Sequence, residues 1–242
     1  MPFRLFVLLV VLLGAIASGA RAEPLSAEQK SAVEALIRAY IHNHPDELLD
    51  ALQSAQDQRD AAAAKAAIAA DHAQLYADPT SPVGGNPHGD VTIVEFFDYR
   101  CPYCKAVEPA LESLLAQDRN LRIVYKEFPV LGPTSVFASR VALAAHAQGK
   151  YGAFHRAMMA TKGSIDDAVV TRVATAVGID MDKAKAAIAA PEIDHVIHSD
   201  YALAESLSIQ GTPAFVIGDQ LVPGTADIDT LKQLVAAARK RG

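Results

Sequence analysis

The two cysteines of this chain restrict its fold and chemistry more than any other feature. They are the only cysteines among 242 residues, and two residues separate them, in the run Cys101-Pro102-Tyr103-Cys104. One such pair excludes a scaffold held by many disulfide bridges. Within one chain it also excludes a four-thiolate zinc site and an iron–sulfur cluster bound by four cysteines. The cysteines must therefore act as one closely spaced pair.

The pair lies where a strand is predicted to end and a helix to begin. The segment 91–97 is β-branched and aromatic, as in a buried strand, whereas 104–116 carries apolar residues at helical spacing. A thiolate at a helix N-terminus meets unpaired backbone N–H groups and the positive end of the helix dipole. We therefore expect Cys101 to react first with a substrate sulfur and Cys104, one turn deeper, to attack the resulting mixed disulfide.

This redox interpretation has two alternatives. A structural disulfide between Cys101 and Cys104 would close a very short loop and would add little stability through chain entropy. The second alternative is that the pair forms half of a metal site, completed by histidine ligands or by a second chain. Two reduced thiolates suit Cu(I) in particular. The redox interpretation, which we adopt, requires neither a cofactor nor a metal.

The remaining sequence after the cysteine pair predicts a small α/β sheet interrupted by helices. The order of strand, helix, strand, helical block, hairpin and helix indicates an α/β domain with a helical insertion. The expected segments are a second strand over 121–128, the insertion over about 134–208, hairpin strands over 214–217 and 220–222, and a helix over 227–241.

Composition and charge narrow the classes of function. Hydrophobic residues make up 51% of the chain and charged residues 21%, which is ordinary for a globular protein and excludes wholesale disorder. The formal net charge is −6, and the sequence contains no long basic block. We therefore expect no nucleic-acid partner.

Residues 1–22 have the pattern of a secretory signal. A short cationic start containing Arg4 is followed by an apolar run over residues 5–17 and by the small-residue motif Ala20-Arg21-Ala22. The apolar run is shorter than the roughly 20 residues that cross a bilayer as a helix. We expect cleavage after Ala22 and export to a bacterial periplasm, where disulfides can form.

Residues 23–77 are predicted to form a helical leader. An apolar stripe recurs at helical spacing on its first helix, and this short segment has too few large apolar residues to build a core of its own. We expect the stripe to pack against copies of itself in a dimer or trimer, the alternative being the protein's own catalytic domain. The stripe consists of Val33, Leu36, Ile37, Tyr40 and Ile41.

A segment rich in proline and glycine follows the leader. Its turn residues predict a linker over 78–90, and the catalytic domain is then expected over 91–242.

Four separated segments of the catalytic region resemble one family. The sequence is similar to DsbA-type thiol:disulfide oxidoreductases, which have a thioredoxin fold with an inserted helical domain. The leader and linker resemble the ScsC-like (suppressor-of-copper-sensitivity) subgroup through Asn-His-Pro-Asp at 43–46 and Pro-Val-Gly-Gly-Asn at 82–86. In that subgroup the leader can make an oligomer. The segments that carry the main resemblance are Glu-Phe-Phe-Asp-Tyr-Arg-Cys-Pro-Tyr-Cys-Lys at 95–105, Glu-Phe-Pro-Val-Leu-Gly at 127–132, Gly-Lys-Tyr-Gly-Ala-Phe-His at 149–155 and Gly-Thr-Pro-Ala-Phe-Val-Ile-Gly at 211–218.

The resemblance implies a substrate-binding role for Thr212 and Pro213. In this family the matching proline follows a cis peptide bond and lies against the reactive cysteines. The backbone of Thr212 would then be presented to an extended substrate, which can add as a strand.

The resemblance also implies residues that tune the redox chemistry. Glu95 matches a buried acid that helps proton transfer at the deeper cysteine, the alternative being a solvent-exposed edge position. Lys126 is its expected charge partner. Pro102 and Tyr103 stand between the cysteines, where the best-known strongly oxidising members carry Pro-His, so isomerase or reductase activity stays open beside oxidation.

The sequence therefore predicts an exported protein disulfide oxidoreductase or isomerase that acts through Cys101 and Cys104. Its expected partners are protein substrates that carry thiols or disulfides, a membrane redox partner, and further copies of the chain. The alternatives are a monomeric dithiol oxidase of the same fold and a copper-tolerance protein that binds Cu(I) through the reduced pair.

Overall fold

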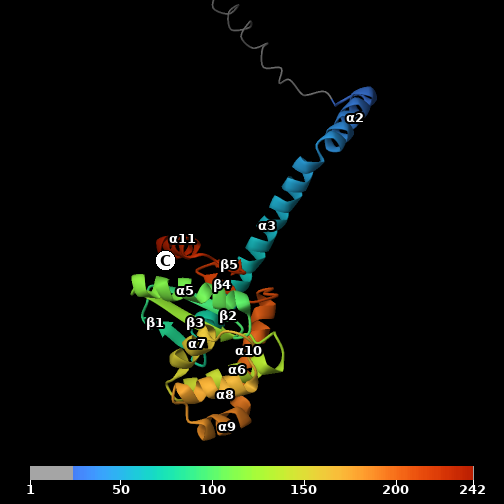
Figure 1. Ribbon diagram of the computed structural model, residues 1–242. Coiled ribbons are helices and arrows are strands. Elements are labelled where there is room, and N and C mark those ends of the chain that lie inside the picture. Colours follow the sequence, from blue (N-terminus) through green and yellow to red (C-terminus); the bar gives the residue numbers. More distant parts are fainter. Residues whose placement is uncertain (1–23, 242) are drawn as a thin grey trace, which may run out of the picture. The chain divides into compact units, whose positions relative to one another are not determined.

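The computed structural model describes residues 24–241, so the predicted signal at 1–22 lies outside the described residues (Figure 1). The chain divides into two compact units, with the boundary between Gln56 and Asp57. Each unit is described by itself. Within residues 24–241, no helix combines the length and apolar character that a membrane crossing requires.

The first unit consists of α2 (Ala27–Asn43) and the first part of α3 (Pro45–Ala70). Helix α2 begins at a capping box, in which Ser26 and Gln29 each accept a hydrogen bond from the other's backbone N–H. Pro45 begins α3, because a proline is tolerated in the first turn of a helix. No residue of α2 is buried, and the side chains of the apolar stripe are 42–70% exposed.

The second unit is built on a sheet of five strands in the order β1-β3-β2-β4-β5. The central strands β2 and β3 are parallel, and the other neighbouring pairs are antiparallel. The strands predicted for 91–97, 121–128 and the hairpin are all present. Their bounds are β1 (Val83–Gly85), β2 (Val91–Phe97), β3 (Leu121–Glu127), β4 (Ala214–Ile217) and β5 (Gln220–Pro223).

Strand β1 lies within the segment expected as a linker. It pairs antiparallel with β3, with Val83 opposite Val124. A Cβ atom at Gly84 would lie 2.7 Å from the side chain of Ile123, so the close approach of the two strands requires glycine there. A strand of three residues that contains two glycines gives no periodic signal, which explains why the sequence indicated only turns.

One face of the sheet is covered by α5 (Pro102–Gln117) and α11 (Ile228–Arg241). Buried side chains from these two helices pack on Ile93, Ile123 and Ile217, which point to the same face because successive strand residues alternate. The buried helix residues include Val107, Leu111, Leu114, Leu231 and Val235. The active-site helix is thus held by the main hydrophobic core.

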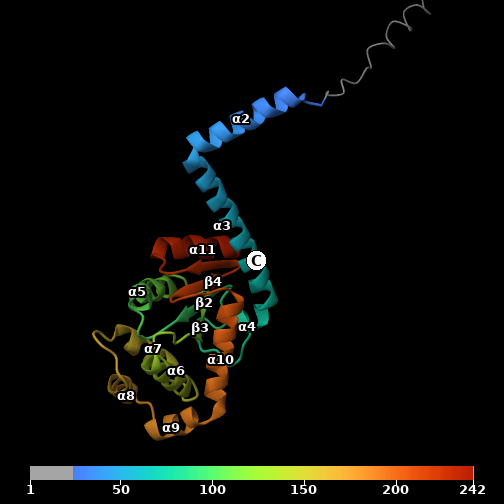
Figure 2. The ribbon, with the colours of Figure 1, turned by 90° about the vertical axis from the view of Figure 1, so that its right-hand side faces the viewer.

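The opposite face is covered by the end of α3, by α4 (His72–Tyr76) and by α10 (Pro191–Ser206) (Figure 2). Ile68 and Leu75 are buried there against Val94 and Phe96 of β2. The last part of the segment predicted as a leader therefore belongs to the second unit. Sequence alone did not indicate this, because these two apolar residues stand far apart in an alanine-rich stretch.

A helical insertion separates β3 from β4, as predicted, and Figure 1 shows its helices gathered beside the sheet. Its first helix is buried on several sides because its alanines let neighbouring helices approach closely. The insertion comprises α6 (Pro133–His146), α7 (Tyr151–Ala160), α8 (Asp167–Ala176), α9 (Met181–Ala189) and α10.

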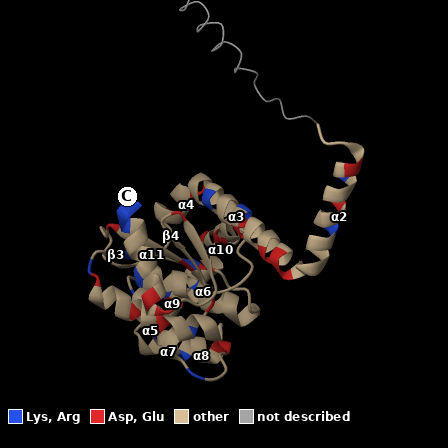
Figure 3. Cartoon of the chain, turned by 90° about the horizontal axis from the view of Figure 1, so that it is seen from above, with Lys and Arg blue, Asp and Glu red and all other residues tan. Residues whose placement is uncertain are grey.

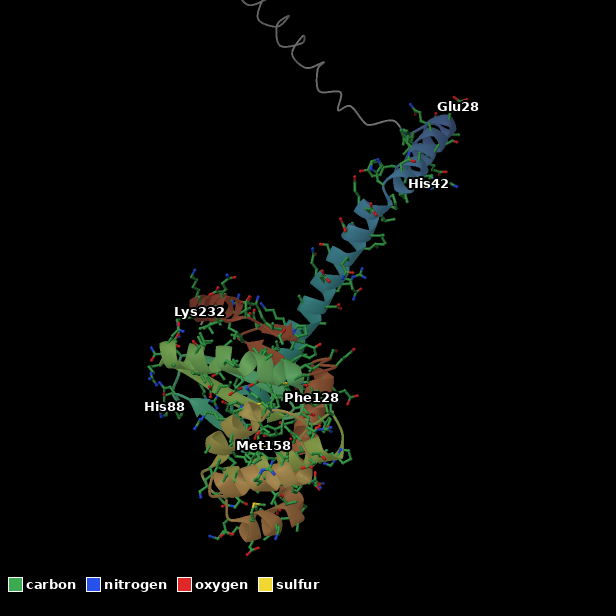
Figure 4. The ribbon with its side chains drawn as sticks, viewed as in Figure 1. Glu28, His42, His88, Phe128, Met158 and Lys232 are labelled. Carbon is green, nitrogen blue, oxygen red and sulfur yellow. The ribbon has the colours of Figure 1, made fainter. Side chains whose placement is uncertain are left out.

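Charges of both signs are interspersed over the helices in the view of Figure 3, in keeping with the modest net charge of −6. Figure 4 shows the side chains of Phe128 and Met158 inside the second unit. Both are buried, at 6% and 0% exposed.

We predict that Leu75→Ala lowers the free energy of unfolding by about 2–5 kcal/mol, because it leaves a cavity where α4 packs on the sheet. Denaturant unfolding of the full chain measures this value. The control is Val130→Ala, since Val130 is 41% exposed and its truncation should change stability by less than about 0.5 kcal/mol. Equal effects of the two substitutions would contradict the packing of α4 on the sheet.

Candidate active site

The two cysteines lie at the junction between β2 and α5. Cys101 is the N-cap residue of α5 and Pro102 occupies the first turn, where a missing N–H costs no hydrogen bond. The side chain of Asp98 fixes the preceding turn, because it accepts hydrogen bonds from the backbone N–H groups of Arg100, at 2.7 Å, and Leu131, at 2.9 Å. The dithiol therefore sits on a rigid junction.

The two thiols are free, and both are buried. Cys101 is 4% exposed and Cys104 is fully buried, whereas Tyr103 between them is 64% exposed. Burial raises the pKa of the Cys104 thiol well above its usual value, and the nearby charges of Glu95 and Cys101 raise it further. This asymmetry is what the proposed roles of attacking and resolving cysteine require.

Residues far away in the sequence complete the site. The Thr212-Pro213 peptide bond is cis, as the resemblance implied. The thiol of Cys101 donates a hydrogen bond to the carbonyl oxygen of Thr212, with an Sγ–O distance of 3.2 Å. The structure thus brings Thr212 and Pro213 beside the reactive pair.

A surface cavity of about 640 Å³ lies beside Thr212 and Pro213. One wall is the alanine-rich end of α3, and the other is the segment 206–214 with part of β5. Its lining is mostly small or apolar. The substrate-binding role of Thr212 and Pro213 stays a prediction.

Glu95 is buried in the centre of the sheet. It lies on β2 between Tyr125 of β3 and Phe215 of β4 and is 0% exposed, so the alternative of an exposed edge position is wrong. Burial raises the pKa of Glu95 well above its usual value, with further contributions from the charges of Glu108 and Glu127. The role of Glu95 in the chemistry stays a prediction.

Lys126 is not the charge partner of Glu95, and that expectation is wrong. Because β3 side chains alternate, Lys126 points to the opposite face of the sheet from its neighbour Glu127. Its Nζ atom lies 2.9 Å from Asp78 Oδ2 and 3.1 Å from Asp200 Oδ1. This buried ion pair network ties the segment before β1 to α10.

A different lysine connects the active-site helix to the insertion. Lys105 follows the resolving cysteine, and its Nζ atom donates to the carbonyl oxygens of Met158, at 2.5 Å, Met159 and Thr161. These carbonyls lie at the C-terminal end of α7, where a cation is favoured by the helix dipole. Burial lowers the pKa of Lys105 to about 8.

Sequence reasoning missed a network of buried polar groups beneath the dithiol. Glu127 accepts hydrogen bonds from Tyr151, at 2.8 Å, and Tyr99, at 3.3 Å. His155 Nδ1 lies 3.3 Å from the Tyr99 hydroxyl and His155 Nε2 lies 3.5 Å from Glu108 Oε2. One signal was available for Glu108, which follows Cys104 by four residues and so shares its buried helix face.

Two groups of side chains at this site could hold a metal ion. The two thiolates would suit Cu(I). Glu95, Glu108 and His155 each offer one ligand atom, and these atoms lie within 4.8 Å of one another. Every other site residue predicted from the sequence, namely Pro102, Tyr103, Thr212 and Pro213, surrounds the dithiol without forming such a set.

Comparison with known proteins assigns the class. The model of the DSBA-like thioredoxin domain matches residues 92–236, so the chain belongs to the family of DSBA-like thioredoxin domains. It is similar to a thioredoxin-like oxidoreductase from Silicibacter pomeroyi DSS-3, with 47% identity, 69% of this chain and 97% of that chain covered, and a TM-score of 0.68.

The similarity extends over the helical segment in one group of solved structures. Proteus mirabilis ScsC in a transitional conformation is 30% identical to this chain, with 90% of this chain and 98% of that chain covered and a TM-score of 0.68. The chain therefore resembles ScsC over most of its length, as the sequence suggested.

The curated relatives include much longer proteins as well as proteins of similar length. The Na(+)/H(+) antiporter NhaA 1 of Salinispora arenicola is 30% identical over 158 residues, which are 64% of this chain and 24% of that protein. This chain thus spans about a quarter of the length of the antiporters it matches. The thiol:disulfide interchange protein DsbA of Bordetella pertussis is 25% identical over 187 residues, which are 72% of this chain and 89% of that protein.

We predict that Cys101 reacts with an alkylating reagent at least ten-fold faster than Cys104, because only Cys101 caps the helix while Cys104 is fully buried. Each thiol is measured alone at neutral pH, Cys101 in Cys104→Ser and Cys104 in Cys101→Ser. A faster reaction of Cys104 would reverse the assigned roles.

We predict that Glu127→Gln makes the stability of the protein less dependent on pH. Burial raises the pKa of Glu127 to about 8 in the folded protein, so the folded state holds a proton that the unfolded chain releases near 4.5. The wild type should therefore lose stability as the pH rises from about 4.5 to 8, by about 1.4 kcal/mol per unit of pKa difference. Denaturant unfolding across this range measures it, and identical profiles for the two proteins would contradict the prediction.

Proposed function

We propose that this chain is an exported protein thiol:disulfide oxidoreductase that also isomerises disulfides. The observation that carries the proposal is the position of Cys101, which is the N-cap residue of α5 and whose Sγ atom lies 3.2 Å from the carbonyl oxygen of Thr212. Membership of the DSBA-like thioredoxin family and the similarity to ScsC support it. The predicted signal and the matched DsbA proteins favour a periplasmic location.

The first chemical step is an exchange at Cys101. Its thiolate attacks one sulfur of a substrate disulfide, the substrate S–S bond breaks, and the second substrate sulfur leaves as a thiolate. The product is a mixed disulfide between Cys101 and the substrate. The substrate backbone would lie beside Thr212, in the cavity between α3 and the segment 206–214.

Two outcomes then compete for the mixed disulfide. Attack by Cys104 on the sulfur of Cys101 releases a substrate dithiol and leaves the enzyme with a Cys101–Cys104 disulfide. Attack by another substrate thiol instead forms a new substrate disulfide and returns Cys101 as a thiolate, which is isomerisation. Oxidation of a substrate is the reverse of the first outcome and of the exchange that precedes it, and it leaves Cys101 and Cys104 reduced. A membrane redox partner would then reoxidise the pair to the disulfide.

The apolar stripe on α2 supports the isomerase assignment. Its five side chains are 42–70% exposed, and they have the arrangement of a surface that copies of the chain would bury. A dimer or trimer would hold several dithiols near one substrate and raise their effective concentration, which favours rearrangement of wrong disulfides. A monomeric dithiol oxidase is the alternative.

We predict that Leu36→Gln with Ile37→Gln converts the full chain to a monomer and lowers isomerase activity on a scrambled protein substrate several-fold, because it disrupts the stripe. Dithiol oxidation should be kept or increased. Solution mass and the two activities measure this. The matched control is Ala35→Gln with His42→Gln, which places two glutamines on the opposite face of the same helix and should change neither.

The outcomes separate the parts of the proposal. A wild-type chain that is monomeric would defeat the oligomeric isomerase. Cys101→Ser should abolish both activities, and its failure to do so would defeat thiol exchange itself.

A further inference from the structure

Three side chains from separate elements converge beneath the dithiol. Glu95 comes from the central strand β2, Glu108 from α5 and His155 from α7, and they are 0%, 8% and 1% exposed. One ligand atom of each lies within 4.8 Å of the other two. We call these three residues the carboxylate–histidine cluster.

The possible ligand atoms of the cluster face one another, and His155 Nε2 lies 3.5 Å from Glu108 Oε2. Both carboxylate oxygens of Glu95 are buried without a hydrogen-bond donor among the described residues, and so are Glu108 Oε2 and His155 Nε2. A buried carboxylate without a partner costs several kcal/mol, so a positive charge or a proton must be supplied between these atoms.

Two lysines near the active site, one half-buried and one buried, have other partners. The ammonium group of Lys105 is taken by three carbonyl oxygens at the end of α7. Lys126 lies on the other face of the sheet, between Asp78 and Asp200. Neither lysine neutralises the cluster.

The imidazole of His155 is held with Nε2 directed at the carboxylates. Its other nitrogen lies 3.3 Å from the Tyr99 hydroxyl, which in turn donates to Glu127. The ring is stacked on Tyr151, with an interplanar angle of 18°, and its centroid lies 4.4 Å from that of Tyr125. A hydrogen bond to the far nitrogen and a fixed ring plane are the usual setting of a metal-ligating histidine.

We propose that Glu95, Glu108 and His155 bind a divalent transition-metal ion of the Zn²⁺ class. Two carboxylates and one imidazole supply three oxygen and nitrogen ligands, and a water molecule would take the fourth position of a tetrahedral site. The charge of the ion would balance the two carboxylates. This site is separate from the soft thiolate pair, and it departs from the sequence-based expectation of no metal.

An ion can reach the cluster from the surface beside α5 and α7. Glu108 lines two surface cavities, of about 440 and 750 Å³, and the second of these also borders Pro102 and Lys105. Ligand atoms around a tetrahedral zinc ion lie about 3.3 Å apart. His155 Nε2 and Glu108 Oε2 are already 3.5 Å apart, and the other separations, of up to 4.8 Å, would close on binding. Binding would tie α7 of the insertion to β2 and α5.

The test uses the full chain with both thiols removed, Cys101→Ser with Cys104→Ser, so that any metal bound is not held by the dithiol. Co²⁺ serves as a spectroscopic probe and Zn²⁺ as its competitor. We expect one ion per chain, a visible absorption spectrum typical of tetrahedral Co²⁺, and a higher midpoint of thermal unfolding with Zn²⁺. Adding Glu108→Gln or His155→Phe should weaken binding at least 100-fold.

The control is His195→Gln in the same background, which removes a histidine outside the cluster and should leave the affinity unchanged. Glu108→Gln is the decisive variant, since it is isosteric and Glu108 is the most exposed of the three residues, at 8%; circular dichroism checks its fold. Binding that survives Glu108→Gln, or a parent protein that binds no ion more tightly than unrelated surface histidines do, would overturn the site. Either result leaves thiol exchange by Cys101 and Cys104 untouched, because that activity is measured with the cysteines intact.

Discussion

The position of one backbone junction determines most of what this protein can do. Strand β2 ends at Phe97, and the chain turns under the hydrogen bonds of Asp98 so that Cys101 becomes the N-cap of α5. Helix α5 packs on the main core. Its N-terminus lies at the end of β2, and β4 begins beside that end, because Ala214 pairs with Phe96. The segment before β4 then brings Thr212 within 3.2 Å of Cys101. In the proposed mechanism, attack by Cys101 and recognition of a substrate backbone by Thr212 would therefore share one site.

The buried charged residues beside this site lie on different faces of the sheet. Residues at odd positions of β3 point toward α5 and α7, so Glu127 joins the polar network of Tyr99, Tyr151 and His155. Lys126, which precedes Glu127 on β3, points to the other face and pairs with Asp78 and Asp200. Strand alternation thus keeps acids without a lysine partner next to the dithiol and places the buried salt bridges where they hold α10 and the segment before β1.

Much of the fold could be predicted, because long apolar strands and amphipathic helices leave a periodic signal. The strand at 91–97 and the cysteine pair at its end are clear from residue types alone, and the insertion follows from the order of elements. The three-residue strand β1 and the docking of Ile68 and Leu75 left no periodic signal, since they depend on contacts between distant segments. The sequence predicted roles for Cys101, Cys104 and Glu95, and these roles stay predictions. It paired Glu95 with the wrong residue and gave no sign that Glu108 and His155 lie beside Glu95, because these contacts also join distant segments.

The most direct test of this account is a titration of the full chain against glutathione redox buffers, followed by mass spectrometry of the quenched protein. The account predicts a reversible two-electron transition to a Cys101–Cys104 disulfide. It also predicts that mixed disulfides with glutathione accumulate on Cys101 in Cys104→Ser, while Cys104 stays unmodified in Cys101→Ser because it is fully buried. A pair that stays reduced across the range of buffers, or a mixed disulfide that forms preferentially on Cys104, would contradict the account.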